Sequence, residues 1–199
     1  MKRVDYPIWN DEFSKFEKAI NKVTNQTKYI TIDFEKGELN RKNYKIWKEN
    51  VKKTLEYWTG KTYVGKEKDK RTQKLFQNFF EAILDLILLC KESDVEELKN
   101  FAEESLYRGK LYRYLGHYKS NEKDIKVKPK FNNIYVSWSK KSKNEYIESK
   151  LKGIITLVSC QVDAPYYGID LDAFDVVKGD EQEVVFPTLK DTIISVDYK

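Results

Sequence analysis

The sequence predicts an α+β fold in which a helical N-terminal subdomain packs on a β-sheet core. Up to residue 104, apolar side chains recur every three or four positions, which is typical of amphipathic helices. From residue 105 onward the spacing changes to two, in aromatic and β-branched runs separated by polar, proline or glycine segments, as in a compact sheet. We therefore expect a mainly helical subdomain, 1–104, and a β-rich core, 105–199, which together form one compact unit.

Four helices are expected in the first subdomain. Their predicted ranges are 11–25, 43–58, 72–90 and 94–104. The third is apolar over most of its surface and is expected to lie centrally. The fourth is preceded by Ser93, with Glu96 three residues later, which is the pattern of a capping box. Between the first two helices, the alternating segment "KYITIDF" predicts a short strand.

Five segments of the second subdomain are expected to contain strands. They are "SLYRGKLYRYLGHY", "FNNIYVSWS", "GIITLVSCQV", "EQEVVFP" and "TIISVDY". One helix is expected to interrupt them, at 142–152. No segment follows the glycine pattern of a Rossmann or P-loop nucleotide site, so neither kind of site is expected.

Composition indicates a globular chain. Hydrophobic residues make up 40% and charged residues 35% of the 199 residues, a balance that excludes the disordered class. The longest apolar run, 83–90, contains Asp85 and is far shorter than the roughly 20 residues that span a bilayer. The N-terminal stretch "MKRVDYPIWNDEF" lacks the apolar segment of a secretory signal. We expect a cytoplasmic protein with no membrane partner.

Cysteine and histidine are too few for most metal and thiol chemistry. Cys90 and Cys160 are the two cysteines, and each lies in an apolar stretch, so buried thiols are expected rather than a disulfide. The single histidine, His117, has no neighbouring residues that form a catalytic signature. No metal site is expected.

Charge is distributed unevenly along the second subdomain. Residues 119–152 contain ten lysines and four acidic residues, whereas 163–197 contain two lysines and nine acidic residues. Such asymmetry suits a site that holds an anionic ligand on one wall and stabilises a cation on the other. Solvated loops explain the same counts, and both interpretations stay open at this point.

Three short segments of the second subdomain combine residues that chemistry uses: "LYRG" at 106–109, "YVSWS" at 135–139 and "EQEVVFP" at 181–187. In this order they resemble the arginine, STS and ExE motifs of the mono-ADP-ribosyltransferase family, in the branch of cholera toxin, the clostridial binary toxins and the vertebrate ecto-ADP-ribosyltransferases. The resemblance covers 105–199 and leaves the helical half unassigned. It implies an ADP-ribosyltransferase-like sheet core and NAD+ as co-substrate.

The first two motifs imply the residues that bind NAD+. In the arginine motif, Arg108 would hold the two phosphates, because a guanidinium donates to oxyanions in two directions, and Gly109 would let the backbone approach the ligand. A second candidate, Arg113 in "YRY", stays open. In the STS motif, Ser137 would hydrogen-bond the nicotinamide ribose and the catalytic glutamate, and Ser139 would complete the motif after a tryptophan where threonine is common.

The third motif implies the residues of the reaction. Glu183 would stabilise the positive charge that develops on the ribose when its bond to nicotinamide breaks. Glu181 would orient or deprotonate the incoming nucleophile. Phe174 is either the exposed aromatic of a substrate-recognising turn or an anchor in the core. Lysines of 140–148 either border the NAD+ phosphates or are solvated.

The resemblance therefore implies an enzyme that transfers ADP-ribose from NAD+ to a macromolecule, with a protein arginine favoured by the E-x-E pattern. Alternatives are the same chemistry on an RNA or DNA base, NAD+ hydrolysis with water as acceptor, and a non-catalytic module that binds RNA or protein. The enzyme would suit the toxin of a toxin-antitoxin pair or an effector delivered to a target cell, with an antitoxin or inhibitor protein as a partner.

Overall fold

The structure is a computed structural model of the 199-residue chain. It describes residues 7–37, 39–58, 70–118, 129–143, 145, 148, 151–176 and 182–198. The chain divides into two compact units, Met1–Lys99 and Asn100–Lys199, which we call the helical unit and the sheet unit. The expected boundary at 104/105 lies at the end of α4 (Glu96–Ser105), a helix that runs across the boundary between the units. That the two parts pack as one compact unit stays a prediction.

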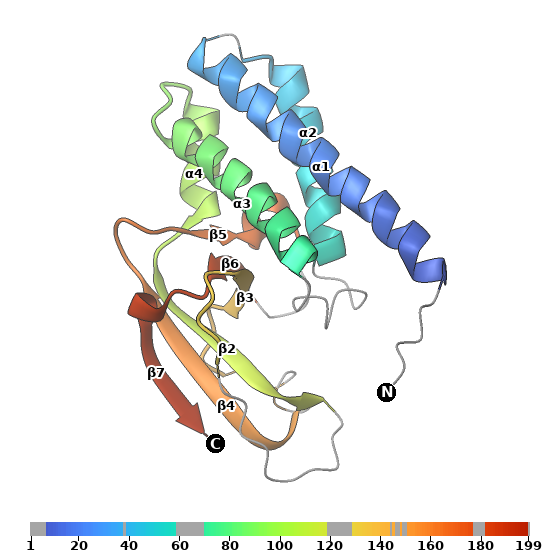
Figure 1. Cartoon of the computed structure of the whole chain (residues 1–199). Coiled ribbons are helices and arrows are strands. Elements are labelled where there is room, and N and C mark those ends of the chain that lie inside the picture. The colour runs from blue at the N-terminus through green and yellow to red at the C-terminus, as the bar shows by residue number, and fades with distance from the viewer. Residues whose placement is uncertain are drawn as a thin grey trace. The chain divides into compact units, whose positions relative to one another are not determined.

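The described part of the helical unit contains three long helices, α1 (Pro7–Glu35), α2 (Arg41–Trp58) and α3 (Lys70–Lys91) (Figure 1). α1 packs along both α2 and α3. As its apolar surface predicts, α3 buries the largest set of side chains, which are Thr72, Leu75, Phe76, Phe79, Phe80, Ala82, Ile83, Leu86, Ile87 and Cys90. Between α1 and α2, Nε1 of Trp47 donates to Oγ1 of Thr27 at 2.8 Å, so the largest buried side chain of α2 has its polar atom bonded.

The segment 28–34 is helical, and the short strand predicted there is wrong. α1 continues through this segment without interruption. Thr27 and Ile30 are buried three positions apart, which is helical spacing. The hydroxyl of Thr31 donates to the carbonyl of Thr27 at 3.0 Å, one turn earlier, and so satisfies a β-branched polar residue within the helix. Packing against the neighbouring helices therefore overrides the alternating pattern.

The ends of the helices differ from the predicted ranges. α4 begins at Glu96, later than predicted, because the chain first makes a turn in which Oγ of Ser93 accepts the N–H of Val95 at 3.1 Å. α1 is much longer than the predicted 11–25. Among the described residues, no helix is long and apolar enough to cross a membrane.

The described residues of the sheet unit form seven strands in one antiparallel sheet, in the order β1-β5-β6-β3-β2-β4-β7. The strands are β1 (Leu106–Tyr107), β2 (Gly109–Tyr118), β3 (Tyr135–Ser139), β4 (Leu151–Val162), β5 (Gly168–Asp170), β6 (Glu183–Pro187) and β7 (Ile193–Tyr198). The long strands β2 and β4 pair with each other (Figure 1). The α+β class is confirmed.

One face of the sheet carries the apolar core of this unit. Trp138 lies opposite Val184, and Leu111 lies opposite Cys160, so these side chains share a face. The buried members of this core are Leu111, Val136, Trp138, Val158, Cys160, Val162, Val184 and Phe186. Because side chains alternate along a strand, the residues between them, including the serines of the STS motif, belong to the other face.

The sequence did not predict β5, because three residues are too short to show alternation. A glycine is needed at its first position, since a Cβ on Gly168 would lie 2.5 Å from Cγ1 of Val184. At its last position, Oδ1 of Asp170 accepts the N–H of Asp172 at 3.2 Å and caps the 3-10 helix η3 (Leu171–Phe174). β5 therefore connects the sheet to a short, capped helix.

Some predictions fall wholly or partly outside the described residues. Glu181 and the side chain of His117 are among these. The predicted helix 142–152 is described only in part, and its last two residues already belong to β4. Residues 119–128, the first part of the basic stretch 119–152, are likewise outside the described residues.

Candidate active site

Residues of two predicted motifs and the alternative arginine lie on adjacent strands. β6, β3 and β2 are neighbours in the sheet, and they contain Glu183, the pair Ser137 and Ser139, and Arg113, respectively. Ser139 is the register partner of both Glu183 and Tyr112. Antiparallel pairing therefore brings together segments that lie far apart in the chain.

Glu183 is a buried carboxylate beside a buried hydroxyl. It is 8% exposed, and its register partner Ser139 is 6% exposed. Directly opposite residues of paired strands point to the same face, so the two side chains share one side of the sheet. Oγ of Ser139 accepts the N–H of Lys141 at 3.1 Å, which orients the hydroxyl. Because an ionised carboxylate is costly to bury, Glu183 is a candidate for a chemical role.

Glu183 follows an irregular backbone position. Gln182 has a φ of 44°, in the left-handed region that residues other than glycine rarely adopt. Its carbonyl accepts the N–H of Lys140 at 3.2 Å. β6 begins at Glu183, within the segment "EQEVVFP" that was expected to contain a strand. The role of Glu181 stays a prediction.

Arg113 contacts the strand that contains the STS motif. Its Nη1 donates to the carbonyl of Ser137 at 2.6 Å, and the side chain is half-buried. Of the two candidate arginines, Arg113 is the one that the described contacts link to β3, through the backbone of Ser137. Because Tyr112 shares the face of Ser139, strand alternation places the side chain of Arg113 on the opposite face, with that of Leu111.

Arg108 lies elsewhere in the sheet unit. Its guanidinium carbon is 3.9 Å from the ring centroid of Tyr167, and its Nε donates to the carbonyl of Tyr166 at 3.3 Å. Gly109 has a φ of 140°, and a Cβ there would lie 2.9 Å from the hydroxyl of Tyr107. The glycine is therefore explained by backbone conformation and by packing of Tyr107, without a ligand.

Lys140 connects the end of β3 to β5 and η3. Its Nζ lies 2.5 Å from Oδ2 of Asp170 and 3.1 Å from Oδ2 of Asp172. Burial lowers the pKa of Lys140, but the hydrogen bonds to the two carboxylates outweigh this and raise it. Burial raises the pKa of Asp170, although Lys140 acts in the opposite direction. Lys140, the first of the lysines of 140–148, is thus paired with two carboxylates of the same chain.

The register partners of Glu183 and Ser139 on the next strands are also polar, so a row of polar residues runs across the sheet. Tyr112 lies opposite both Ser139 and Ser159, and Ser159 lies opposite Ser195. The hydroxyl oxygens of Ser159 and Ser195 are 2.5 Å apart. We call these five residues the polar row. They form a band of a carboxylate, a phenol and three hydroxyls on the face opposite the apolar core.

Phe174 is an anchor in the core, and the alternative of an exposed substrate-recognising aromatic is wrong. The side chain is fully buried, and its ring lies 5.4 Å from that of Phe101, centroid to centroid, in an edge-on arrangement. The physical reason is η3, which begins at the cap Asp170 and ends at Asp175 in a left-handed conformation, and so turns Phe174 inward.

Sequence reasoning did not anticipate Tyr112, Ser159 and Asp170 at this site. Tyr112 and Ser159 gave no local signal, because their place in the polar row depends on the pairing register. Asp170 follows the short apolar pair "GI" and precedes "LD", a pattern that indicates a capping aspartate but does not identify Lys140 as its partner. Among the described residues, no cluster of histidine, cysteine and carboxylate side chains is arranged to hold a metal ion.

Comparison of the chain with protein families, with curated proteins and with solved structures finds no match. The strands β6, β3 and β2 and the motif resemblance are therefore the features that bear on function.

Proposed function

We propose that this protein is an NAD+-dependent mono-ADP-ribosyltransferase that transfers ADP-ribose to a macromolecular acceptor. The observation that supports this most is the strand order β6-β3-β2, which places the buried Glu183 opposite Ser139 and links Arg113 to Ser137. An arginine, two serines and a glutamate on neighbouring strands are the residue types that NAD+ cleavage requires.

The residues of the sheet fit the chemical demands of NAD+ as a substrate. When NAD+ is bound, its ribose gains positive charge as the bond to nicotinamide breaks. The carboxylate of Glu183 would stabilise that charge, and its buried position strengthens the interaction because water does not screen it. The hydroxyls of Ser137 and Ser139 would hold the ribose and keep the carboxylate in a fixed orientation.

We assign phosphate binding to Arg113 in preference to Arg108. Arg113 shares a hydrogen bond with the strand of the two serines, whereas Arg108 stacks on Tyr167 and bonds a turn at 166. The E-x-E pattern favours a protein arginine as the acceptor, with Glu181 orienting it. Transfer to a nucleic-acid base and hydrolysis by water use the same residues and differ in the acceptor.

Release of nicotinamide from labelled NAD+ tests the proposal. The wild-type protein should release nicotinamide, and Glu183→Gln should reduce the rate about a hundredfold or more, because the substitution keeps the shape and removes the charge. Glu103→Gln, at an exposed position of α4, is the matched control and should keep the wild-type rate. Absence of release by the folded wild-type protein, or wild-type turnover by Glu183→Gln, would overturn the proposal.

The choice of arginine is tested by measuring KM for NAD+ in Arg113→Lys and Arg108→Lys. We expect Arg113→Lys to raise KM about tenfold, because lysine lacks the planar, two-pronged donor geometry of the guanidinium, and Arg108→Lys to leave it nearly unchanged. The reverse result would return phosphate binding to Arg108.

A further inference from the structure

The exposed side of α1 carries a regular stripe of lysines. Lys15, Lys18, Lys22, Asn25 and Tyr29 are all exposed and lie three or four positions apart, so they follow one another along one side of the helix. Successive members are about one turn, roughly 5 Å, apart along the axis. Tyr29 ends the stripe and is 70% exposed, the most exposed large apolar side chain among the described residues.

Two hydrogen bonds determine which part of α2 lies beside this stripe. Nδ2 of Asn50 donates to Oε1 of Gln26 at 3.0 Å, and Nε1 of Trp47 donates to Oγ1 of Thr27 at 2.8 Å. The two helices are antiparallel, so residues before Trp47 lie beside the C-terminal part of α1, and residues after Asn50 lie beside its N-terminal part (Figure 1).

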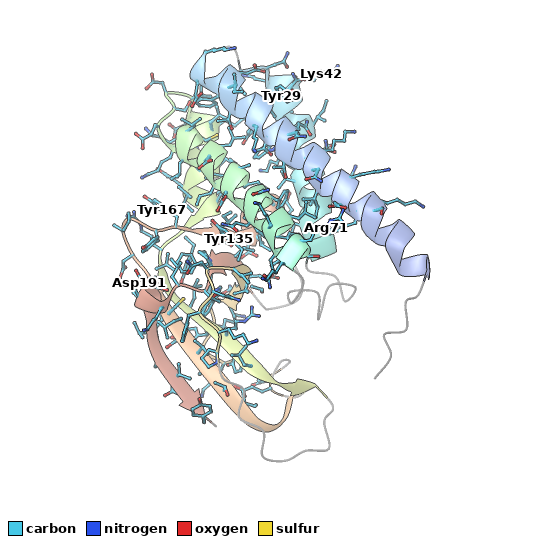
Figure 2. All side chains as sticks on the ribbon, in the orientation of Figure 1. Tyr29, Lys42, Arg71, Tyr135, Tyr167 and Asp191 are labelled. Carbon is cyan, nitrogen blue, oxygen red and sulfur yellow. The ribbon has the colours of Figure 1, made fainter. Side chains whose placement is uncertain are left out.

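α2 adds two lysines to the same surface. Lys42 and Ile46 are exposed near the end of α1 that holds Tyr29, and Lys53 is exposed nearer Lys22. Figure 2 labels Tyr29 and Lys42 at the same end of the helix pair. We call the surface formed by Lys15, Lys18, Lys22, Lys42, Lys53 and Tyr29 the lysine face.

The described carboxylates do not pair with the lysines of this face. Among the described residues, the ammonium groups of its five lysines form no ion pair or side-chain hydrogen bond, unlike Lys140 and Arg71, which are paired with carboxylates. α2 as a whole has six basic residues against two acidic ones. Among the described residues, Asp33, Glu49 and Glu56 are the acidic residues on neighbouring helix positions, so five lysines face three carboxylates and the net charge of this surface is positive.

We propose that the lysine face binds single-stranded nucleic acid. A regular line of ammonium groups matches a strand, whose phosphates also recur at regular intervals, better than it matches the irregular carboxylates of a folded protein. Tyr29 supplies an exposed ring on which a base stacks. The exposed apolar side chains of α1 and α2 are too few for the continuous apolar face with which a helix lies in a membrane surface.

The inference goes beyond the proposed chemistry and does not depend on it, because binding is measured without NAD+. The probe is a fluorescein-labelled oligouridylate of roughly 20 nucleotides, longer than the span of a single small domain. Anisotropy titrations at several salt concentrations give the dependence of log K on log salt. If all five lysines contact phosphates, the slope is about −3.5, since each neutralised phosphate of a single strand contributes about −0.7.

A matched pair of triple variants separates this face from net charge. Lys15→Gln, Lys18→Gln and Lys22→Gln together should weaken binding at least tenfold and reduce the slope by about 2. Lys74→Gln, Lys99→Gln and Lys190→Gln together remove the same charge from exposed positions elsewhere and should leave both quantities nearly unchanged. Circular dichroism checks that both variants are folded.

Tyr29 provides the second readout. Tyr29→Ala should weaken oligouridylate binding about tenfold without altering the salt slope, and Tyr29→Phe should restore it, because stacking needs the ring and not the hydroxyl. Absence of oligouridylate binding at low salt, or equal weakening by the two triple variants, would overturn the proposal. Preferential binding to phosphatidylserine vesicles over the oligonucleotide would overturn it as well, in favour of a membrane partner.

Discussion

The helical unit and the sheet unit bury their polar groups in different ways. In the helical unit, the buried hydroxyls of Thr24, Thr27 and Thr54 each donate to the carbonyl one turn earlier in the same helix. In the sheet unit, two buried polar groups are also held by distant segments: Asp170 pairs with Lys140, and the hydroxyl of Ser159 bonds that of Ser195 on the next strand. The two buried charged side chains of the described residues, Asp170 and Glu183, both belong to the sheet unit.

Backbone conformation follows the same division. The described non-glycine residues with left-handed φ are Asn133, Asp175 and Gln182, all in the sheet unit. Two of these flank the segment that leads from η3 into β6. Left-handed backbone conformations and buried carboxylates therefore occur near the candidate site. Functional sites commonly retain such destabilising features, which the rest of the fold compensates.

The two cysteines allow the units to be compared directly, because Cys90 lies in the helical unit and Cys160 in the sheet unit. Both are fully buried, and burial raises the pKa of each thiol to about 12. At pH 8 each should react with iodoacetamide about a thousandfold more slowly than a free cysteine, whose pKa is about 8.5, before the effect of steric protection is added.

Increasing urea should expose each thiol as its own unit unfolds, and mass spectrometry of the two cysteine peptides reports the two midpoints separately. Different midpoints would sharpen the distinction between the units. Equal midpoints would show that the chain unfolds as one cooperative structure. Rapid alkylation of either thiol in the native protein would contradict the burial described here.

A smaller effect is expected from Lys140→Met, which removes a charge from the sheet unit and keeps most of the alkyl stem. Asp170 then stays buried without its lysine, and the unfolding free energy should fall by about 2–3 kcal/mol at neutral pH, less than for a fully buried pair because Lys140 is partly exposed. Asp172→Asn, at the more exposed carboxylate, is the control and should cost less than about 0.5 kcal/mol.

The pH dependence of this deficit has a definite sign. Burial already raises the pKa of Asp170, and loss of Lys140 should raise it further. A carboxyl group whose pKa is higher in the folded state favours folding when protonated, so this stability is present below its unfolded pKa of about 4 and is lost as the pH rises. Urea titrations at pH 4 and pH 7 should therefore show the larger deficit at pH 7. A deficit that does not depend on pH would assign the loss to packing.

Much of the fold could be predicted from local pattern, and the site could be predicted only in part. Five predicted strand segments contain strands of the sheet, because each is long enough to show alternation. The error at 28–34 arose because an alternating, β-branched segment is packed as a helix by α2 and α3. Local pattern contains no information on such tertiary packing.

For the site, the motif resemblance identified Ser137, Ser139 and Glu183, which the sheet places on neighbouring strands. It favoured Arg108 and kept Arg113 as an alternative, and a single sequence could not show that Arg113 is the one that contacts β3. Phe174 could not be assigned either, since its burial follows from the cap that Asp170 provides. The missing information in each case is the pairing of distant segments, which a single sequence does not specify.

The smallest effects are expected from one substitution made in both units. In the helical unit, Thr27→Val removes the acceptor of the buried Trp47 indole N–H and should lower the unfolding free energy by about 1–2 kcal/mol. In the sheet unit, the hydroxyl of Thr156 is buried with no hydrogen-bond partner among the described residues. Thr156→Val, which keeps the shape, should therefore raise stability by about 1 kcal/mol. Opposite signs in urea titrations would support this difference between the two threonines, and destabilisation by Thr156→Val would show that its hydroxyl is satisfied.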